Sequence, residues 1–302
     1  MATGRKYTAY GGQAVIEGVM MKGSEGQMAV ACRRSNGDIV VKYENQLPLT
    51  KKYPFLGLPI LRGMVSFIDS LVGGVKVLNY SAELYGEGVD GEESLKDWQM
   101  ILAVILALVL GVGIFMVLPT VVLRFLPLQQ IQSSLLRNLL EGVIRILFFL
   151  AYVTSVSYVE DIRRVFQYHG AEHKTIYCYE AKEPLTVENV RKYSTLHPRC
   201  GTNFLFIVMV VASLFFSLFG WPNLFVRVLS RLLLMPLVAG ISYEVLRYMG
   251  KHAGENRIVD FFTKPGLWLQ KLTTREPDDS QMEVAIRALQ GVLPPEEVSI
   301  HV

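Results

Sequence analysis

The chain is poor in charge and in cysteine for its length. Of its 302 residues only 19% are charged while 51% are hydrophobic, and the net charge at pH 7 is +3. Such a composition is typical of a membrane protein and unusual for a soluble domain. Three cysteines are too few for a disulfide framework, so we expect free or metal-binding thiols facing a reducing compartment.

Several functional signatures are missing as well. The sequence has no basic run interleaved with aromatics, no P-loop and no internal repeat, so we expect no nucleic-acid partner. Its first residues carry charge and glycine, which predicts no cleaved targeting peptide. The remaining partners are the lipid bilayer and an unknown membrane or cytosolic substrate.

Long apolar runs dominate the last two thirds of the chain. About 20 apolar residues suffice to cross the hydrocarbon core of a bilayer. We predict four spans, at 100–126, 135–158, 203–221 and 225–248. Because the connection within each pair of spans is short, the spans form two transmembrane hairpins, 98–158 and 203–248.

Basic residues set the predicted orientation. Residues 1–99 hold eleven Lys and Arg and the 159–202 loop holds seven, whereas the short connections hold none. Since cytoplasmic loops carry the excess of Lys and Arg, we place both termini and the central loop in the cytosol, with the spans in the inner membrane.

The N-terminal part has a different character. Residues 1–58 predict a cytosolic, β-rich segment with a hairpin of 28–34 and 38–43, joined by a type I′ turn at Asn36-Gly37. Glycines there suit tight turns and close backbone packing, or an anion cradle: Gly11, Gly12 and Gly18. Residues 59–97 predict an amphipathic helix, on the membrane surface or against the bundle, and an acidic linker.

The C-terminal part, 249–302, predicts cytosolic amphipathic helices. The apolar stretch 258–272 is expected to break at Pro265-Gly266. A capping box at Ser280-Gln281-Met282-Glu283 is expected to open a last helix that ends near residue 292.

One short string carries the chemistry. His169 and His173 are four residues apart and share a helix face, with Glu172 between them, in the H-x-x-E-H order of inverzincins. That spacing lets two imidazoles bind one metal ion while the Glu acts as general base. The alternative is a solvated helix whose histidines hydrogen-bond their neighbours. We expect the second span to continue as one rigid helix to His169.

A second cluster follows at His197-Pro198-Arg199-Cys200-Gly201. A turn there can present His197 and Cys200 together, so we predict a divalent ion, zinc, held by His169, His173, His197 and Cys200. A closed set of four ligands is structural, and an open set is catalytic; the alternative is a plain loop. Four other residues are further candidates as ligands: Cys178, Glu180, His252 and Glu255.

Charges inside the spans need partners. Arg137, Glu141 and Arg145 step by four along the second span, which predicts pairing with one another. The alternative is a polar cavity that they share with Arg231 and Glu244, and Glu244 could also approach the histidine cluster.

The strings that carry these candidates resemble the YqhQ-like family of bacterial membrane proteins. The resemblance rests on residues 11–21, 170–174, 197–202 and 272–277 and runs nearly end to end. The family is a domain of unknown function described as predicted metal-dependent enzymes, which implies a metal site at these motifs and names no substrate.

Together these observations predict a mostly α protein. Its core is a polytopic four-helix transmembrane bundle, topped by a small cytosolic α+β cap that includes the N-terminal hairpin and the 159–202 loop. The leading function is a metal-dependent hydrolase at the membrane–cytosol boundary, with Glu172 as base. The rivals are a non-enzymatic scaffold or biogenesis factor and, less favoured by the uncharged first and third spans, a transporter.

Overall fold

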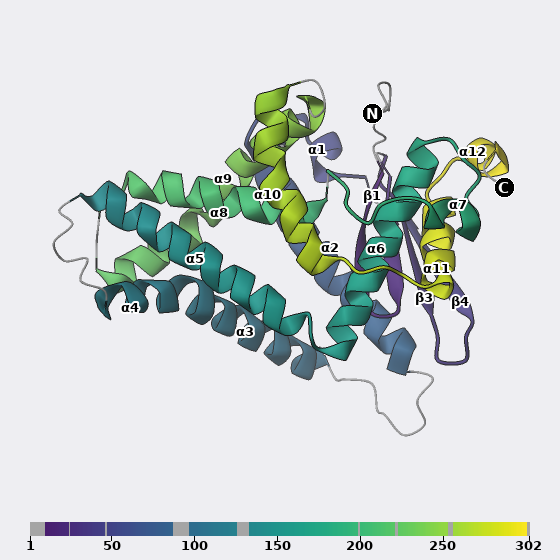
Figure 1. Cartoon of the computed structure of the whole chain (residues 1–302), viewed down its shortest axis with the longest axis horizontal. Helices are drawn as coiled ribbons and strands as arrows, with labels where there is room; N and C mark the ends of the chain where they lie inside the picture. Colours follow the sequence, from purple (N-terminus) through teal and green to yellow (C-terminus); the bar gives the residue numbers. More distant parts are fainter. Residues whose placement is uncertain are drawn as a thin grey trace.

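The computed structural model describes residues 10–23, 25–45, 47–86, 97–125, 133–198, 200–220, 223–252 and 256–300. In this part the chain is mostly helical, with one small antiparallel sheet near its N-terminus. Figure 1 shows long apolar helices gathered at one end and the sheet with its covering helices at the other. The predicted class, mostly α with a small α+β part, is confirmed.

The sheet has four strands in the order of the sequence, each antiparallel to the next. They are β1 (Gly11–Val15), β2 (Gly18–Lys22), β3 (Gln27–Arg33) and β4 (Ile39–Asn45). The last two form the predicted hairpin, with Val30 opposite Lys42. The glycine-flanked apolar segment before them forms a second hairpin, β1–β2, whose register pairs Val15 with Gly18.

The turn of the β3–β4 hairpin differs from the prediction. Gly37 has φ +93°, whereas Asn36 is not among the described non-glycine residues with positive φ. The Arg34 amide donates to the Asp38 carbonyl, so the loop has three residues with glycine in the left-handed position. A type I′ turn requires positive φ at both central residues, and the prediction of that turn type was wrong.

Both faces of the sheet are covered. One face presents Val19, Met21, Ala29 and Ala31 to α6 (Glu160–Glu180) and α11 (Asp279–Gln290), and these residues are fully buried. The other face packs Val15, Val30 and Cys32 against α2 (Leu61–Gly86). The sheet therefore holds α6, the helix of the histidine pair, in place.

Three helices are long and apolar enough to cross a membrane within the described ranges. The first combines α3 (Asp97–Val112), a π-helical turn (Gly113–Val117) and α4 (Leu118–Phe125). The others are α5 (Ser134–Val156) and α9 (Leu224–His252). The remaining predicted span, 203–221, corresponds to α8 (Gly201–Ser217), an apolar helix of 17 residues that packs against α5 and α9. These findings are consistent with a membrane protein.

The second span does not continue into the histidine helix. The α5 helix ends at Val156, and α6 begins at Glu160 in a new direction (Figure 1). The junction combines β-branched residues and serine, which are poor helix formers, and Glu160 and Asp161 favour a new helix N-terminus. The predicted rigid rod was wrong, and the sheet fixes α6 instead.

Two C-terminal predictions also need correction. The α10 helix (Arg257–Thr273) runs without a break through Pro265-Gly266, and Gly266 lies against Asn203 of α8. Tertiary packing thus overrides the local breaking tendency of this pair. The capping box of α11 uses Asp278 and Gln281, two residues earlier than expected.

The short helices complete the fold. The α7 helix (Val187–Arg191) starts with Thr186 as its cap. A further helix follows α11, so α11 is not the last one. The remaining short elements are α1 (Leu49–Lys52), a 3-10 turn (Pro54–Gly57) and α12 (Pro295–Ile300).

Candidate metal centre

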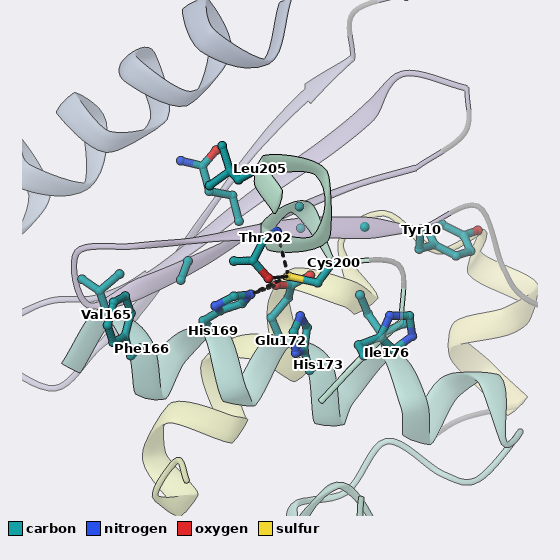
Figure 2. Close-up of a pocket in the computed structure, with 16 residues that line it drawn as sticks. Tyr10, Val165, Phe166, His169, Glu172, His173, Ile176, Cys200, Thr202 and Leu205 are labelled. Atoms are coloured by element: carbon teal, nitrogen blue, oxygen red, sulfur yellow. Dashed lines mark hydrogen bonds and ion pairs between the residues drawn. The ribbon is translucent and has the colours of Figure 1, made fainter. Parts of the chain in front are cut away.

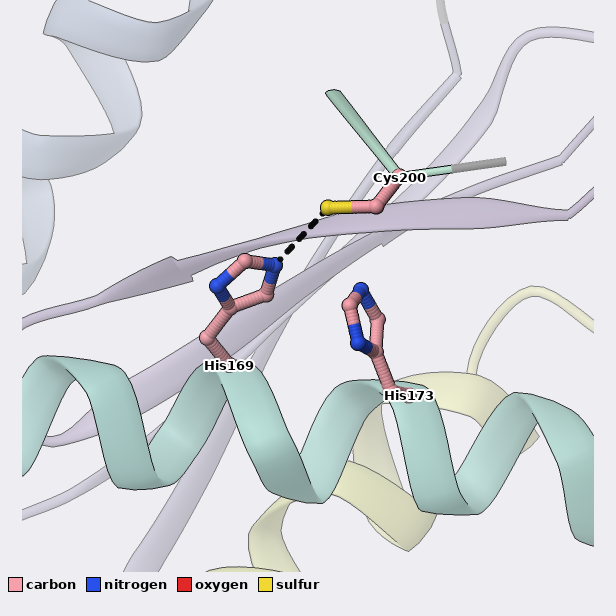
Figure 3. A group of neighbouring side chains, drawn as sticks. All are labelled: His169, His173 and Cys200. Carbon is pink, nitrogen blue, oxygen red and sulfur yellow. Dashed lines mark hydrogen bonds between the residues drawn. The ribbon is translucent and has the colours of Figure 1, made fainter. Parts of the chain in front are cut away.

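His169 and His173 lie on one face of α6, as the spacing predicts. Their ring centroids are 4.4 Å apart. His173 is buried and His169 is partly buried. Together with Cys200 they offer three ligand atoms that all lie within 4.8 Å of one another (Figure 3).

Cys200 reaches this face from the N-terminus of α8. Its Sγ lies 3.1 Å from Nε2 of His169. The sulfur also accepts hydrogen bonds from the Thr202 amide at 3.4 Å and from the Thr202 hydroxyl at 3.2 Å. Two ligands of one tetrahedral zinc ion lie about 3.5 Å apart, so the His169–Cys200 distance is close to that of a ligand pair.

The outer nitrogen of each histidine is fixed by a backbone carbonyl. Nδ1 of His169 lies 2.8 Å from the Thr273 carbonyl oxygen, and Nδ1 of His173 hydrogen-bonds the Thr195 carbonyl. A carbonyl can only accept, so each Nδ1 carries the proton and each Nε2 keeps its lone pair. This arrangement is the one that orients metal-binding imidazoles.

Gly170 lets a C-terminal segment cross α6 at the histidines. A Cβ at this position would lie 2.1 Å from the Arg275 carbonyl oxygen. The Arg275 amide donates to the Phe166 carbonyl at 2.9 Å, and buried Lys174 binds the Glu276 carboxylate. The segment 273–276 is thereby held over the helix, where it supplies the acceptor for His169.

His197 lies beside the three-residue cluster. Its ring centroid is 5.7 Å from that of His173, and its Nε2 is 3.5 Å from a carboxylate oxygen of buried Glu180. Gln270 of α10 hydrogen-bonds both the amide and the carbonyl of His197 at 2.7 Å. The structure thus brings His169, His173 and Cys200 together. His197 lies beside His173 but outside this group of three.

Glu172 lies next to the cluster and against the start of β1. One carboxylate oxygen lies 4.0 Å from Nε2 of His169. Burial raises the pKa of this carboxyl, against the opposing effects of His169 and of a hydrogen bond from the Gly12 amide. A carboxyl whose pKa is raised suits proton transfer. Gly12 is required there, because a Cβ would lie 3.0 Å from Glu172 Cγ and 2.5 Å from the Met20 carbonyl oxygen.

A cavity of about 740 Å³ opens at these side chains (Figure 2). Glu172 and the three possible ligands line it together with apolar residues of three elements. These residues are Ala14, Val165, Phe166, Ile176 and Leu205. A small molecule can therefore reach Glu172 and the cluster from one space.

The remaining ligand candidates lie elsewhere. The Cys178 thiol belongs to the buried core, where burial raises its pKa to about 12. His252 bonds the Tyr248 carbonyl of its own helix, and Glu244 pairs with Arg62 of α2. Arg199 and Glu255 fall outside the described residues.

The donor set fits a divalent transition metal. Two imidazole nitrogens and one sulfur are ligands that zinc accepts, whereas calcium and magnesium prefer oxygen. Both imidazoles have the outer hydrogen bonds that such ligands normally make. A His169–His173–Cys200 cluster could hold a metal ion.

Comparison with known proteins agrees with the resemblance noted in the sequence. Residues 58–295 match a family described as "Protein of unknown function (DUF1385)". The chain belongs to this family. It is also 37% identical to the uncharacterized protein YqhQ of Bacillus subtilis (strain 168), over 96% of this chain and 94% of that protein. No solved structure matches the chain.

Sequence reasoning missed the parts of the site that act through the backbone. The Thr195 and Thr273 carbonyls orient the two histidines, and any residue type provides a carbonyl. The string 272–277, one of those that carry the YqhQ-like resemblance, was the only sequence signal for this contact. Gly12 was seen as a close-packing glycine, but nothing in the sequence tied it to Glu172.

Proposed function

We propose that the protein is a metal-dependent hydrolase that works where its cap meets the membrane. The observation that carries this proposal is the pair of imidazoles on α6. Backbone carbonyls fix their Nδ1 atoms, and the two rings line one cavity together with Cys200 and Glu172. Three protein ligands leave a fourth position for substrate or water, as in catalytic zinc sites.

The residues divide the work. His169, His173 and Cys200 would hold the ion, which supplies Lewis acidity and acidifies water. Glu172, 4.0 Å from Nε2 of His169, is placed to take a proton from the attacking water and return it to the leaving group. His197 lines the same cavity beside His173, with its Nε2 3.5 Å from a carboxylate oxygen of buried Glu180.

The cavity points to a substrate carried in the membrane. It extends from the cluster to Leu205 of α8, four residues beyond Gly201, about 6 Å along the helix. Leu205 is 45% exposed, and α8 packs between the candidate spans α5 and α9, so we place its N-terminus at the membrane surface as a fourth, short span. A substrate with an apolar tail in the bilayer would reach Glu172 with its polar end.

Glu172→Gln tests the catalytic role. This change removes the base and no ligand, so the ion should stay while hydrolysis falls by about a hundredfold. Metal content by plasma mass spectrometry and turnover of ester and phosphoester substrates, in detergent and in vesicles, measure the two effects. Glu160→Gln, at the start of the same helix, is the control and should change neither quantity.

A structural role for the ion is the second candidate. Its support is that the cluster joins α6 of the cap to the first residue before α8, which would clamp the two parts together. If the wild type binds the ion, hydrolyses none of the substrates and loses thermal stability on chelation, the scaffold reading replaces the enzyme.

The proposed orientation puts both termini and the cap in the cytosol of the inner membrane. Single cysteines at Ser35, in the β3–β4 loop, and at position 130 should label from opposite sides, with position 130 reached from outside intact cells. The three native cysteines are buried, which keeps the background low. Labelling of position 35 from outside would contradict the orientation.

A further inference from the structure

A cluster of arginines lies at the end of the apolar helices that is far from the cap. Glu141 of α5 is fully buried and receives Arg231 Nη2 of α9 at 2.9 Å, Arg145 Nη2 at 3.1 Å and the Thr120 hydroxyl at 2.8 Å. Arg227 Nη1 is 3.6 Å from its second oxygen. The predicted pairing of Glu141 with Arg145 is present, and Arg231 and Arg227 share the same carboxylate.

The charges in this cluster do not balance. Three guanidinium groups surround one carboxylate, which leaves a surplus of two positive charges. The sequence has no other carboxylate to offer from these segments, because Glu141 is the only acidic residue in 98–159 and Glu244 the only one in 200–252. Glu244 is bound to Arg62 at the other end of α9 and does not join the cluster.

The protein offers only partial compensation for this surplus. Nε of Arg145 donates to the Phe115 carbonyl, which lies in the π-helical turn. The Phe216 ring lies 5.7 Å from the Arg231 guanidinium carbon, but a ring face offsets less than a full charge. Nε of Arg231, a side chain only 4% exposed, has no hydrogen-bond partner among the described residues.

The cluster lies in the half of the apolar helices that is away from the cap. Glu141 and Arg231 each lie seven residues from the starts of α5 and α9, about 10 Å along the helix axis, and Arg227 lies about 4.5 Å from the start of α9. Long arginine side chains at such positions reach towards the interface, where lipid phosphates lie. Guanidinium groups match phosphate oxygens in planar, two-pronged hydrogen bonds.

We propose that Arg145, Arg227 and Arg231 form a binding site for a phosphate-type anion, supplied by the headgroup of an anionic lipid in the leaflet away from the cap. The carboxylate of Glu141 gathers the three arginines from two helices, and the lipid phosphate neutralises their surplus. The site is separate from the histidine cluster and needs no activity there.

The test uses the full-length protein in phosphatidylcholine vesicles with and without phosphatidylglycerol, and with inorganic phosphate in place of the anionic lipid. Native mass spectrometry and thermal melting should show phosphatidylglycerol bound and a higher melting temperature. Arg227→Gln should weaken lipid binding by about tenfold, and Arg227→Lys, which keeps the charge, should restore most of it. Arg62→Gln is the matched control, since that arginine has a balanced partner in Glu244.

The outcomes separate the sources of the anion. Protection by phosphatidylglycerol alone supports the lipid, and equal protection by inorganic phosphate supports the anion site but assigns it to the free ion. If Arg227→Gln does not fold, the wild type decides, because a site for an anionic lipid requires that phosphatidylglycerol raise its melting temperature above that in phosphatidylcholine alone. Wild-type protein that is folded and binds neither anion, or a loss in Arg62→Gln equal to that in Arg227→Gln, overturns the proposal.

Discussion

Wild-type protein purified without chelator should carry about one divalent ion per chain, and His173→Ala should carry none. The change removes one of three ligands, and even changes to the residues that orient such ligands cost tenfold to a hundredfold in affinity, so we expect a loss of more than about a hundredfold. Plasma mass spectrometry of metal per chain measures the effect, and zinc is the ion expected from the nitrogen and sulfur donors.

His252→Ala is the matched control for this experiment. His252 is a partly buried histidine at the end of α9 whose ring bonds the Tyr248 carbonyl of its own helix. Its loss should leave the metal content unchanged. Cys200→Ala should behave like His173→Ala, since Sγ lies 3.1 Å from Nε2 of His169. Folded wild-type protein without metal would remove the metal hypothesis.

Gly170→Ala should destabilise the protein by about 3 kcal/mol, because the new methyl group cannot fit. It would lie 2.1 Å from the Arg275 carbonyl oxygen, which is backbone and cannot turn away. The segment 273–276 must move off α6, and His169 then loses the Thr273 carbonyl that orients it. Thermal melting in detergent should fall by about 6 °C or more, and metal affinity should fall with it.

Gly73→Ala provides the comparison at a helical glycine with open space. Nothing lies within 4 Å of a Cβ built at Gly73 in α2, so the change should be neutral or stabilising by up to about 1 kcal/mol. Equal melting temperatures for the two variants would show that the crossing at Gly170 is not tight. Retained metal in a destabilised Gly170→Ala would show that the Thr273 carbonyl does not orient His169.

The sequence predicted elements whose periodicity is strong and failed where tertiary packing decides. The β3–β4 hairpin and the apolar helices follow from alternation and from long hydrophobic runs. The break at 157–159 and the unbroken course of α10 through Pro265 do not, because the sheet fixes α6 and because Gly266 packs on Asn203. Local propensity is a weak prior beside such contacts.

The side chains of the candidate site could be predicted from the sequence, but the groups that orient them could not. The spacing of His169 and His173 predicted a shared helix face, and both rings do face Cys200. The position of His197 behind His173 depends on Gln270, which is 73 residues away along the chain. No spacing rule reaches across that distance, and backbone carbonyls leave no trace in a sequence.

The contact of His169 with Thr273 has a consequence for how the protein is made. The two residues are 104 positions apart, whereas the three possible ligands are complete once Cys200 has been synthesised. A growing chain therefore exposes its ligands before it possesses the carbonyl that orients the first of them. Metal acquisition should be a late event in biogenesis, finished after the apolar helices have entered the bilayer, and a ribosome-bound chain that ends before residue 273 should hold the ion weakly.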